Sequence, residues 1–397
     1  MLPIENILLY IGILLLLSVF SSKISDKMAV PALLAFIVIG MLAGSEGLGG
    51  IYFDDPWIAK FIGIVALNFI IFFGGMETDW KHMRSIALPG VMLATLGVVI
   101  TALVTGLFAA MIMGWSLIEG LLLGAIVSST DAAAVFSILR SRHIHLKGTL
   151  QPLLELESGS NDPMAAFLTL GFLGILANQG VSLVGLLPLF LLDMVLGLII
   201  GYIMSRIGIY LMNRLHLGYH GLYPVLSIAL MLIAYAIATI IKGNGFIAVY
   251  LVGLLMSREE FQHKKNIQKF HEGWAWLMQI AMFLTLGLLV FPSQAISMVS
   301  LGVLISAALI FAARPLAVFL CLLPFKMPIN EKLLVSWVGL KGAAAIILAI
   351  FPLLTGIGHA KDIFNVVFVV VLISVFFQGT SIPYVSRLLK VDLPLQE

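Results

Sequence analysis

The chain has 397 residues, of which 61% are hydrophobic and 11% charged, and its mean hydropathy is +1.12. Soluble domains average about 25% charged residues, so this composition excludes a water-covered surface and indicates an integral membrane protein. The net charge of +2, without a long basic run, excludes a nucleic-acid partner. A single cysteine, Cys321, excludes disulfides and cysteine metal clusters within the chain.

Thirteen apolar segments, separated by charged or turn-rich breaks, follow one another along the chain. A helix needs about 20 apolar residues to cross the hydrocarbon core. The first segment has neither a basic n-region nor a clear cleavage site, so we expect it to be retained as a membrane helix. The predicted spans are residues 5–22, 29–47, 58–76, 86–113, 116–140, 149–178, 183–213, 221–241, 244–257, 274–292, 298–323, 331–355 and 362–386.

The basic residues favour one orientation of these spans. With the N-terminus outside, 17 Lys and Arg residues fall at the inside ends, and only Lys60, Lys242 and Lys361 fall outside. Two more, Arg314 and Lys341, lie within spans. The excess of inside charge follows the positive-inside rule. We therefore predict a multi-pass protein of the cell membrane with its N-terminus outside and its C-terminus in the cytoplasm.

An odd number of spans permits two inverted six-helix repeats within one transmembrane domain. Residues 1–178 would form the first repeat and 221–386 the second, joined by a linker helix at 183–213. Adding 212 to Thr130 in "VSSTDAAAV" gives Gly342 in "VGLKGAAAI", and both tracts weaken a helix before a run of alanines. Interrupted helices in matching positions of inverted repeats are typical of transporters. We predict an all-α fold with breaks in the fifth and twelfth spans.

Charged and hydroxyl residues at these breaks suit the ends of half-helices. Ser129 or Thr130 is expected to cap a half-helix that begins near Asp131, whose carboxylate would offset the free amide groups. Lys341 has two interpretations of equal weight: its ammonium offsets the carbonyl end of a half-helix, or its side chain extends to water. Small residues that allow close helix packing would explain either tract alone.

Six acidic residues lie within the predicted spans, where an ionisable group is a functional hypothesis by default. Glu119 is near an outer end, so we expect it to be exposed to solvent. Asp193 stands alone in an apolar run, and a structural polar contact is favoured for it. The other four acids, in the fifth and sixth spans, are Asp131, Glu155, Glu157 and Asp162.

The tract "ESGSNDP" at 157–163 combines a carboxylate and a hydroxyl on one helix face. Ser158 and Asp162 are four residues apart, and Glu155 precedes Ser158 by three. With broken-helix carbonyls opposite, these groups supply the oxygen ligands that suit a small monovalent cation. A desolvated carboxylate can bind a proton instead. Cation and proton would then compete for Asp162, and this competition is itself an exchange mechanism.

Arg314 needs an anion inside the membrane because guanidinium stays charged. We expect Glu157 to be its partner, with Asn161 as a neutral second contact. Loss of one partner of such a buried pair costs about 3–5 kcal/mol. Glu157 and Arg314 are therefore interpreted as structural, and Asp162 as the transported-ion site.

Four tracts jointly resemble the monovalent cation:proton antiporter superfamily, and most closely its NhaP-type sodium or potassium/proton antiporters. They are "STDAAAV" (129–135), "ESGSNDP" (157–163), "ARP" (313–315) and "GLKGAAAIILAIFP" (339–352). "PALLAFIVIGMLAGSEGLGG" (31–50) is also similar to the second helix of these proteins, so the resemblance covers nearly the whole chain.

The resemblance implies a homodimer in the lipid bilayer, each subunit having a dimerisation domain and a core domain with crossed, broken helices. It implies ion binding by Asp162 with help from Ser158 and Thr130, and it places Asp131 at the crossing. No cofactor is expected besides the transported K⁺ or Na⁺ and H⁺. It also pairs Glu157 with Arg314, as the charges alone suggest.

Asn161 and Asp162 form an Asn–Asp pair similar to that of the family branch that exchanges one cation for one proton. The resemblance therefore implies electroneutral exchange. The chain departs from its relatives at Phe73 in "FFGG", where an acid is common; Glu77 lies four residues on, near the predicted cytoplasmic end. Lys341 stands where arginine is common, which keeps the charge but loses the planar fork. Potassium-type relatives often continue into cytosolic regulatory domains, and none is expected within the chain, which stops at Glu397.

We therefore expect a secondary antiporter rather than an enzyme, exchanging a monovalent cation for H⁺ by alternating access at Asp162, with a role in pH homeostasis. The alternatives are a passive cation channel, although no repeated filter motif appears, and a membrane receptor or scaffold with structural charges. His143, His145, His263 and His271 fall in predicted inner loops and are candidate pH sensors. Solvated loop histidines are nevertheless far commoner.

Overall fold

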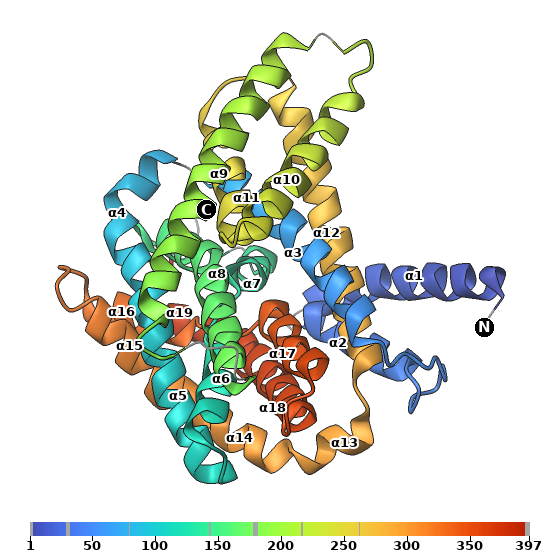
Figure 1. The fold of residues 1–397 in the computed structure, drawn as a ribbon, viewed down its shortest axis with the longest axis vertical. Coiled ribbons are helices and arrows are strands. Elements are labelled where there is room, and N and C mark those ends of the chain that lie inside the picture. Colours follow the sequence, from blue (N-terminus) through green and yellow to red (C-terminus); the bar gives the residue numbers. More distant parts are fainter. Residues whose placement is uncertain are drawn as a thin grey trace.

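The fold is a bundle of helices (Figure 1), and all regular secondary structure among the described residues is helical. Eight helical stretches in the described part of the chain are long and apolar enough to cross a membrane, and shorter apolar helices accompany them. The computed structural model describes residues 3–28, 32–78, 80–142, 144–177, 182–215, 217–261 and 263–393.

The helices of the first half of the chain are α1 (Ile4–Met28), α2 (Ala32–Ala43), α3 (Pro56–Glu77), α4 (Trp80–Met92), α5 (Val98–Met113), α6 (Leu117–Ile126), α7 (Ala132–Ser141), α8 (Leu150–Leu176) and α9 (Leu186–Arg214). The second half contains α10 (Leu222–Ile240), α11 (Gly245–Arg258), α12 (Lys264–Leu289), α13 (Pro292–Ser297), α14 (Val299–Ala308), α15 (Arg314–Cys321), α16 (Ile329–Trp337), α17 (Ala343–Thr355), α18 (Ala360–Ile373) and α19 (Gly379–Leu388). Three π-helical turns join neighbouring helices: η1 (Leu93–Gly97), η2 (Leu309–Ala313) and η3 (Ser374–Gln378).

Each of the thirteen predicted apolar segments contains helix, but several boundaries differ from the prediction. The second segment is helical only over Ala32–Ala43, the fourth begins at Trp80, and the tenth begins at Lys264, ten residues before the predicted start. The early starts have one cause. A helix that projects beyond the apolar layer carries polar residues in its first turns, so the apolar run marks only its middle.

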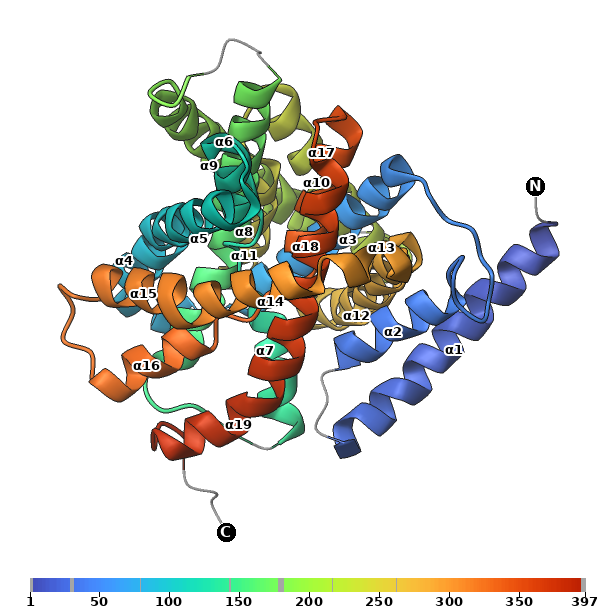
Figure 2. The ribbon, with the colours of Figure 1, turned by 90° about the horizontal axis from the view of Figure 1, so that it is seen from below.

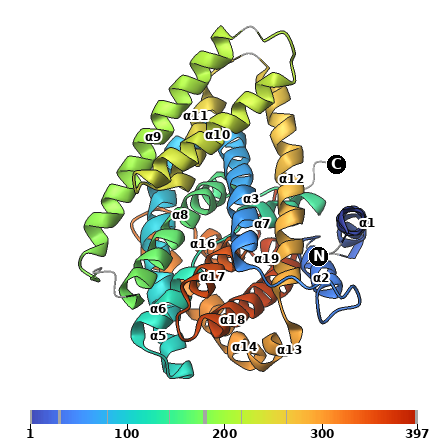
Figure 3. The same cartoon turned by 45° about the vertical axis from the view of Figure 1, so that its right-hand side comes forward.

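The helices group into two bundles (Figures 1 and 3). We call α1–α3 with α9–α12 the scaffold bundle, and α4–α8 with α14–α19 the core bundle. α1 lies beside α2 at one edge of the molecule (Figure 2). The bundles meet along a seam where α3 packs against α17 and α8 against α11. Helices that carry candidate site residues therefore face the scaffold bundle.

Close helix contacts in the scaffold bundle depend on glycine. A Cβ atom on Gly287 of α12 would lie 2.8 Å from the Cα atom of Gly40 on α2, and a Cβ on Gly253 of α11 would lie 3.3 Å from the Cα of Gly75 on α3. Lipid offers no hydrophobic driving force between helices, so such backbone-to-backbone packing holds them together. It also fixes α3 and α11, which form one wall of the site.

The three π-helical turns all lie in the core bundle, each between two α-helices. η1 interrupts the fourth predicted span and η2 the eleventh, and η2 ends immediately before Arg314. η3 carries two polar side chains, Ser374 and Gln378, into the protein interior. Single π turns widen a helix and re-aim the residues beside them, often at functional sites.

Candidate ion-binding site

Two interrupted helices lie against each other in the core bundle. One break separates α6 from α7 and the other separates α16 from α17. The backbone N–H of Asp131 in the first break donates to the carbonyl of Leu340 in the second, at 2.8 Å. A Cβ on Gly342 would collide with the Asp131 carboxylate, so only glycine fits there. Both predicted breaks are thus present, and a backbone hydrogen bond joins them.

The start of α7 is capped by Asp131 itself. Its Oδ1 atom accepts a hydrogen bond from the backbone N–H of Ala134 at 3.0 Å, and the helix begins one residue after it. The prediction that Ser129 or Thr130 caps this helix is therefore wrong. A carboxylate at an N-cap satisfies a free amide and also opposes the positive end of the helix dipole.

Lys341 binds the free carbonyl groups on the α6 side of the same break. Its Nζ atom donates to the carbonyls of Ser128 (3.2 Å) and Ser129 (2.9 Å), which follow the end of α6. The residue is 1% exposed, so its side chain does not extend to water. Of the two interpretations of Lys341, the structure shows the one in which its ammonium offsets carbonyl ends.

α8 places two polar side chains against the first break. The Ser158 hydroxyl donates to the carbonyl of Thr130 at 2.8 Å. The Asn161 amide donates to the Thr130 hydroxyl at 2.6 Å, and Asn161 is fully buried. The expected contact from Asn161 to Arg314 is wrong: a guanidinium can donate only to Asn161 Oδ1, and this buried atom has no hydrogen-bond partner among the described residues. Ser158, Asn161 and Thr130 together hold α8 on the break.

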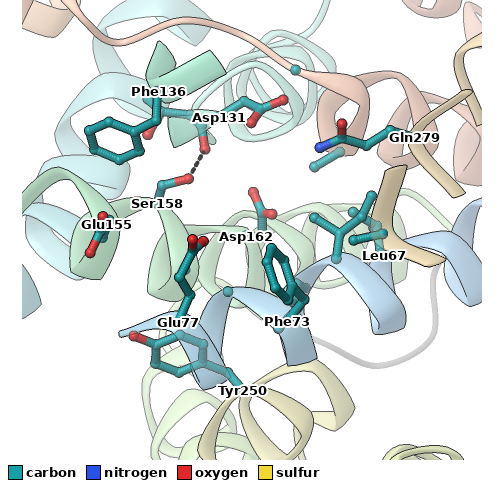
Figure 4. A pocket seen from close by; sticks show the side chains of 18 of the residues that line it. Leu67, Phe73, Glu77, Asp131, Phe136, Glu155, Ser158, Asp162, Tyr250 and Gln279 are labelled. Atoms are coloured by element: carbon teal, nitrogen blue, oxygen red, sulfur yellow. Dashed lines mark hydrogen bonds between the residues drawn. The ribbon is translucent and has the colours of Figure 1, made fainter. Parts of the chain in front are cut away.

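Asp162 lies between these groups and a cavity. Its Oδ1 atom is buried and has no hydrogen-bond partner among the described residues. The residue borders a cavity of about 160 Å³ between the two bundles (Figure 4). The Asp131 carboxylate and the Lys341 ammonium are the charges that act on it most strongly. An unsatisfied carboxylate oxygen is costly unless something binds it, so Asp162 is placed to hold a proton or a cation.

The cavity collects residues from both bundles. Besides Asp162, its lining includes Ser158, Thr130 and Asp131 from the core bundle, and Phe73 from α3. All four residues predicted to bind the ion therefore share one cavity. Among the described residues, no cluster of three or more His, Cys, Asp or Glu side chains could hold a metal ion.

Glu157 and Arg314 form the expected ion pair, away from the cavity. The Arg314 guanidinium donates to both carboxylate oxygens of Glu157, with Nη2 to Oε2 at 2.9 Å, and also to the carbonyl of Val335 at 3.2 Å. Both side chains are almost fully buried. Gly339 leaves room for the guanidinium, because a Cβ there would lie 2.7 Å from Arg314 Nε.

Two residues that support the second break were missed in the sequence. The backbone N–H of Lys341 donates to the Ser374 hydroxyl at 2.9 Å, and that hydroxyl donates to the Gln378 side-chain carbonyl at 2.5 Å. The Gln378 amide donates to the carbonyl of Trp337 at 2.7 Å. Free backbone groups on both sides of the break are thus satisfied from η3. The only signal in the sequence is a Ser/Gln pair four residues apart in an apolar run.

The other intramembrane acids make structural contacts. Glu119 and Ser116 form a capping box at the start of α6, where Ser116 is exposed and Glu119 is half-buried. Asp193 on α9 accepts a hydrogen bond from the Asn244 amide at 2.9 Å, and this amide also donates to the carbonyl of Pro163 at 3.3 Å. The favoured structural contact of Asp193 is present.

The candidate pH-sensing histidines are not equivalent. The sequence predicts an inner-loop position for His271, and this prediction is wrong. His271 is fully buried within α12, and its Nε2 lies 2.7 Å from the Ser227 hydroxyl. The early start of α12 explains the error. His263 precedes α12, and His145 lies between α7 and α8, as expected for loop residues. His143 lies outside the described residues.

Comparison with known proteins identifies the family. A model of the transmembrane part of sodium/hydrogen exchangers matches residues 11–388. The K(+)/H(+) antiporter NhaP of Alkalimonas amylolytica is 47% identical over 387 residues, which are 98% of this chain and 67% of that protein. The K(+)/H(+) antiporter NhaP2 of Shewanella oneidensis is 41% identical over 398 residues, 98% and 68% of the respective chains. The chain belongs to the sodium/hydrogen exchanger family, and the resemblance seen in the sequence is confirmed.

A solved structure shares the fold. The sodium proton antiporter MjNhaP1 of Methanocaldococcus jannaschii at pH 8 matches with a TM-score of 0.83 over 95% of this chain and 100% of that chain. At 24% identity this likeness concerns the fold alone. The multi-pass helical architecture expected from the sequence is therefore shared with that solved structure.

Proposed function

We propose that this protein is a secondary active antiporter that exchanges a monovalent cation for H⁺ by alternating access at Asp162. The observation that carries the proposal is the buried, unpartnered Asp162 oxygen beside a cavity at the junction of two broken helices. Membership of the sodium/hydrogen exchanger family supports the same reaction.

The site offers oxygen ligands for a desolvated cation. The Asp162 carboxylate would hold the ion together with the oxygens of Ser158 and Thr130, while Asp131 contributes a second negative charge nearby. Lys341 balances part of that charge from the break. Because a carboxylate in this setting binds either a cation or a proton, binding of one expels the other, and no separate coupling device is needed.

We propose K⁺ as the preferred cation. The relatives that are 47% and 41% identical are named as K(+)/H(+) antiporters, whereas Na(+)/H(+) antiporter 1 of Methanocaldococcus jannaschii is 26% identical over 358 residues. Phe73, rather than an acid, lines the cavity from α3. Proteoliposome exchange measured with Na⁺, K⁺ and Rb⁺ tests the preference: higher apparent affinity for Na⁺ than for K⁺ would contradict it.

We propose that the exchange is electroneutral, one cation for one proton. Asn161 is neutral and bonded to Thr130, so Asp162 is the one carboxylate of the "ND" pair that changes charge. Asn161→Asp adds a second carboxylate at this position, and exchange by this variant is expected to polarise the membrane. A potential-sensitive dye measures it; an unchanged signal in an active variant would contradict this account of the stoichiometry.

The two bundles supply the moving parts of the proposed mechanism. The core bundle would slide against the scaffold bundle along the seam between α3 and α17, carrying the neutralised site across the membrane. In the predicted orientation of the thirteen spans, the end of the cavity lined by the half-exposed Glu77 faces the cytoplasm. Two such subunits are expected to form a homodimer through their scaffold bundles in the cell membrane.

An imposed gradient separates an antiporter from a passive channel. Proteoliposomes with a K⁺ gradient and no initial pH gradient should develop a pH gradient, because exchange drives protons uphill. The channel and scaffold alternatives predict no uphill movement. A pH-sensitive dye inside the vesicles reports the result, and a dissipating K⁺ gradient without proton movement would contradict the proposal.

A further inference from the structure

Asn244 forms a buried hydrogen bond between the two bundles, directly beside the proposed ion site. The residue is the N-cap of α11 in the scaffold bundle and is 7% exposed. Its side-chain Nδ2 atom donates to the backbone carbonyl of Pro163 on α8 at 3.3 Å. Pro163 follows Asp162 in the chain, so its carbonyl belongs to the helical turn that carries the ion site. The proposed exchange reaction does not use Asn244.

The other hydrogen bonds of Asn244 fix it to the scaffold bundle. Its Nδ2 atom also donates to Oδ2 of Asp193 on α9 at 2.9 Å, and its backbone N–H donates to the Asp193 carbonyl at 2.9 Å. Its Oδ1 atom accepts a hydrogen bond from the backbone N–H of Ile247 at 3.1 Å. The backbone of α9 lies close by, since a Cβ on Gly197 would lie 2.6 Å from the Asn244 carbonyl oxygen. The amide is therefore held in one orientation.

Asp193 helps to set this orientation of the amide. A free Asn side chain rotates among several rotamers, and the entropy lost in ordering it opposes a new hydrogen bond. Because Nδ2 is bonded to Asp193 and Oδ1 to Ile247, the Asn244 amide is ordered before α8 approaches it. An acidic residue within a membrane span is costly. Orienting the amide gives Asp193 a role beyond joining α9 to the start of α11.

The bond to Pro163 crosses the seam along which the proposed mechanism requires movement. α8 and α11 pack against each other there. A donor–acceptor distance of 3.3 Å is already long for a hydrogen bond, so a shift of α8 by about 2 Å breaks it. Another polar contact across the seam, between Arg140 and Glu77, is exposed and therefore screened by solvent. The Asn244 bond is buried, so it favours the observed arrangement of the bundles.

We propose that Asn244 is a positioning residue: its amide, oriented by Asp193, holds the core bundle in the observed position and must release Pro163 before Asp162 can cross. The bonds from Asn244 to the scaffold bundle stay intact during the movement. Because the bond to Pro163 exists in only one of the two states, it shifts the balance between them. The inference rests on the proposed function in one respect: Asp162 reaches the two faces of the membrane in turn.

Loss of the amide should change the balance between the two states. Asn244→Ser keeps a good N-cap residue for α11 but removes the amide that reaches Pro163. In proteoliposomes, the apparent KM for K⁺ at the face that Asp162 reaches in the observed state should rise relative to the KM at the opposite face. The ratio of the two KM values should change about threefold, as expected for one hydrogen bond. Lower stability alone reduces the amount of active protein and leaves this ratio unchanged, so an unchanged ratio would overturn the proposal.

Asn68→Ser is the matched control. Asn68 is 1% exposed in α3 of the scaffold bundle, and its amide donates to the Ile64 carbonyl of the same helix at 2.9 Å. The substitution removes the same chemical group from a buried position, but the lost bond lies within one helix. The KM ratio should stay at the wild-type value. A shift equal to that of Asn244→Ser would show that loss of any buried amide has this effect, and it would overturn the role of Asn244.

Asp193 should act through Asn244. Asp193→Leu leaves the amide free to turn away from Pro163, so it should change the KM ratio in the same direction as Asn244→Ser. In the double variant the ratio should equal that of Asn244→Ser alone, because the oriented group is already absent. Asp193→Asn keeps an acceptor oxygen and should restore most of the wild-type ratio. Additive effects in the double variant would refute the role given to Asp193.

The balance of states can be measured without transport. Spin labels at Trp57→Cys on α3 and Tyr384→Cys on α19, both exposed positions, report the distance between the bundles in a Cys321→Ser background. Asn244→Ser should change the ratio of the two distance populations about threefold, and unchanged populations would overturn the proposal. A shift in a protein that fails to exchange cations for protons would uphold the role of Asn244 and refute the proposed function, so the two claims fail separately.

Discussion

Arg314 donates hydrogen bonds to both carboxylate oxygens of Glu157, deep in the core bundle. The pair joins α15 to α8 five residues before Asp162, so it fixes the rotation of the helix that carries the proposed ion site. The third Arg314 contact, to the Val335 carbonyl on α16, ties the second broken helix to the same point. One guanidinium thus positions both sides of the site.

Replacing one partner of this pair should lower the stability of the protein far more than replacing both partners. Glu157→Leu or Arg314→Met alone leaves a buried charge without a partner and should cost about 3–5 kcal/mol of stability, whereas the double variant should cost less than either. Unfolding of the purified protein in detergent measures the order. A double variant as unstable as the sum of the singles would contradict it.

The exposed pair of Arg206 and Glu259 is the control for this series. Its side chains are 56% and 43% exposed, and its nitrogen–oxygen distance is 3.6 Å. Solvent screens such a pair, so Arg206→Met should change stability little. A loss comparable to that of Arg314→Met would show that charge in general, rather than burial, sets the effect.

The crossing of the broken helices depends on glycine at two positions. Gly342→Ala would push a Cβ into the Asp131 carboxylate, and Gly339→Ala would place one 2.7 Å from Arg314 Nε. Both variants should lower the exchange rate at least about tenfold, because small displacements of a positioned site are costly. Gly358→Ala, with nothing within 4 Å of its Cβ, should exchange normally. Normal exchange by Gly342→Ala would contradict the crossing as described.

The Ser374 hydroxyl should be required for the shape of the second break. Ser374→Ala leaves the Lys341 backbone N–H without its partner, and an unmade buried hydrogen bond costs about 1–3 kcal/mol. Ser374→Thr keeps the hydroxyl and should restore most of the stability and exchange rate. Thermal unfolding and proteoliposome exchange measure the two effects; equal loss in both variants would point to packing instead.

Several features of the site were predictable because the sequence contains both partners of an interaction. A buried guanidinium needs an anion, so Arg314 and Glu157 could be paired without coordinates. The two breaks follow from runs of helix-weakening residues at matching positions, and Asp162 stands out as a carboxylate in an apolar helix. Each of these inferences depends on the high cost of charge or of free backbone in a membrane.

Other features could not be predicted because several partners were equally plausible. Asn161 can bond to any donor or acceptor in reach, and only the fold places the Thr130 hydroxyl there. Ser374 and Gln378 become capping groups through a π-helical turn that no residue pattern announces. His271 was misplaced because α12 begins in a polar stretch that resembles a loop.

Acid should weaken one contact between the loop after α2 and the start of α13. In the loop after α2, Glu46 accepts hydrogen bonds from the Ser293 hydroxyl (2.5 Å) and backbone N–H (2.7 Å), and these hold the pKa of Glu46 below its usual range. A lowered pKa contributes stability above the ordinary Glu pKa of about 4.3, and this contribution is lost as the pH falls through the lower folded value. Glu46→Gln should therefore lower the unfolding temperature at pH 7 but not at strongly acidic pH. A difference that grows on acidification would contradict this.

The central claim is that cation and proton exchange at one carboxylate. The most direct test compares Asp162→Asn with wild type in proteoliposomes, with Asp362→Asn as control, because Asp362 lies at the start of α18 and outside the cavity lining. The account predicts no K⁺-driven proton movement in Asp162→Asn, unchanged movement in Asp362→Asn, and folded protein in both. Full exchange by folded Asp162→Asn would contradict it.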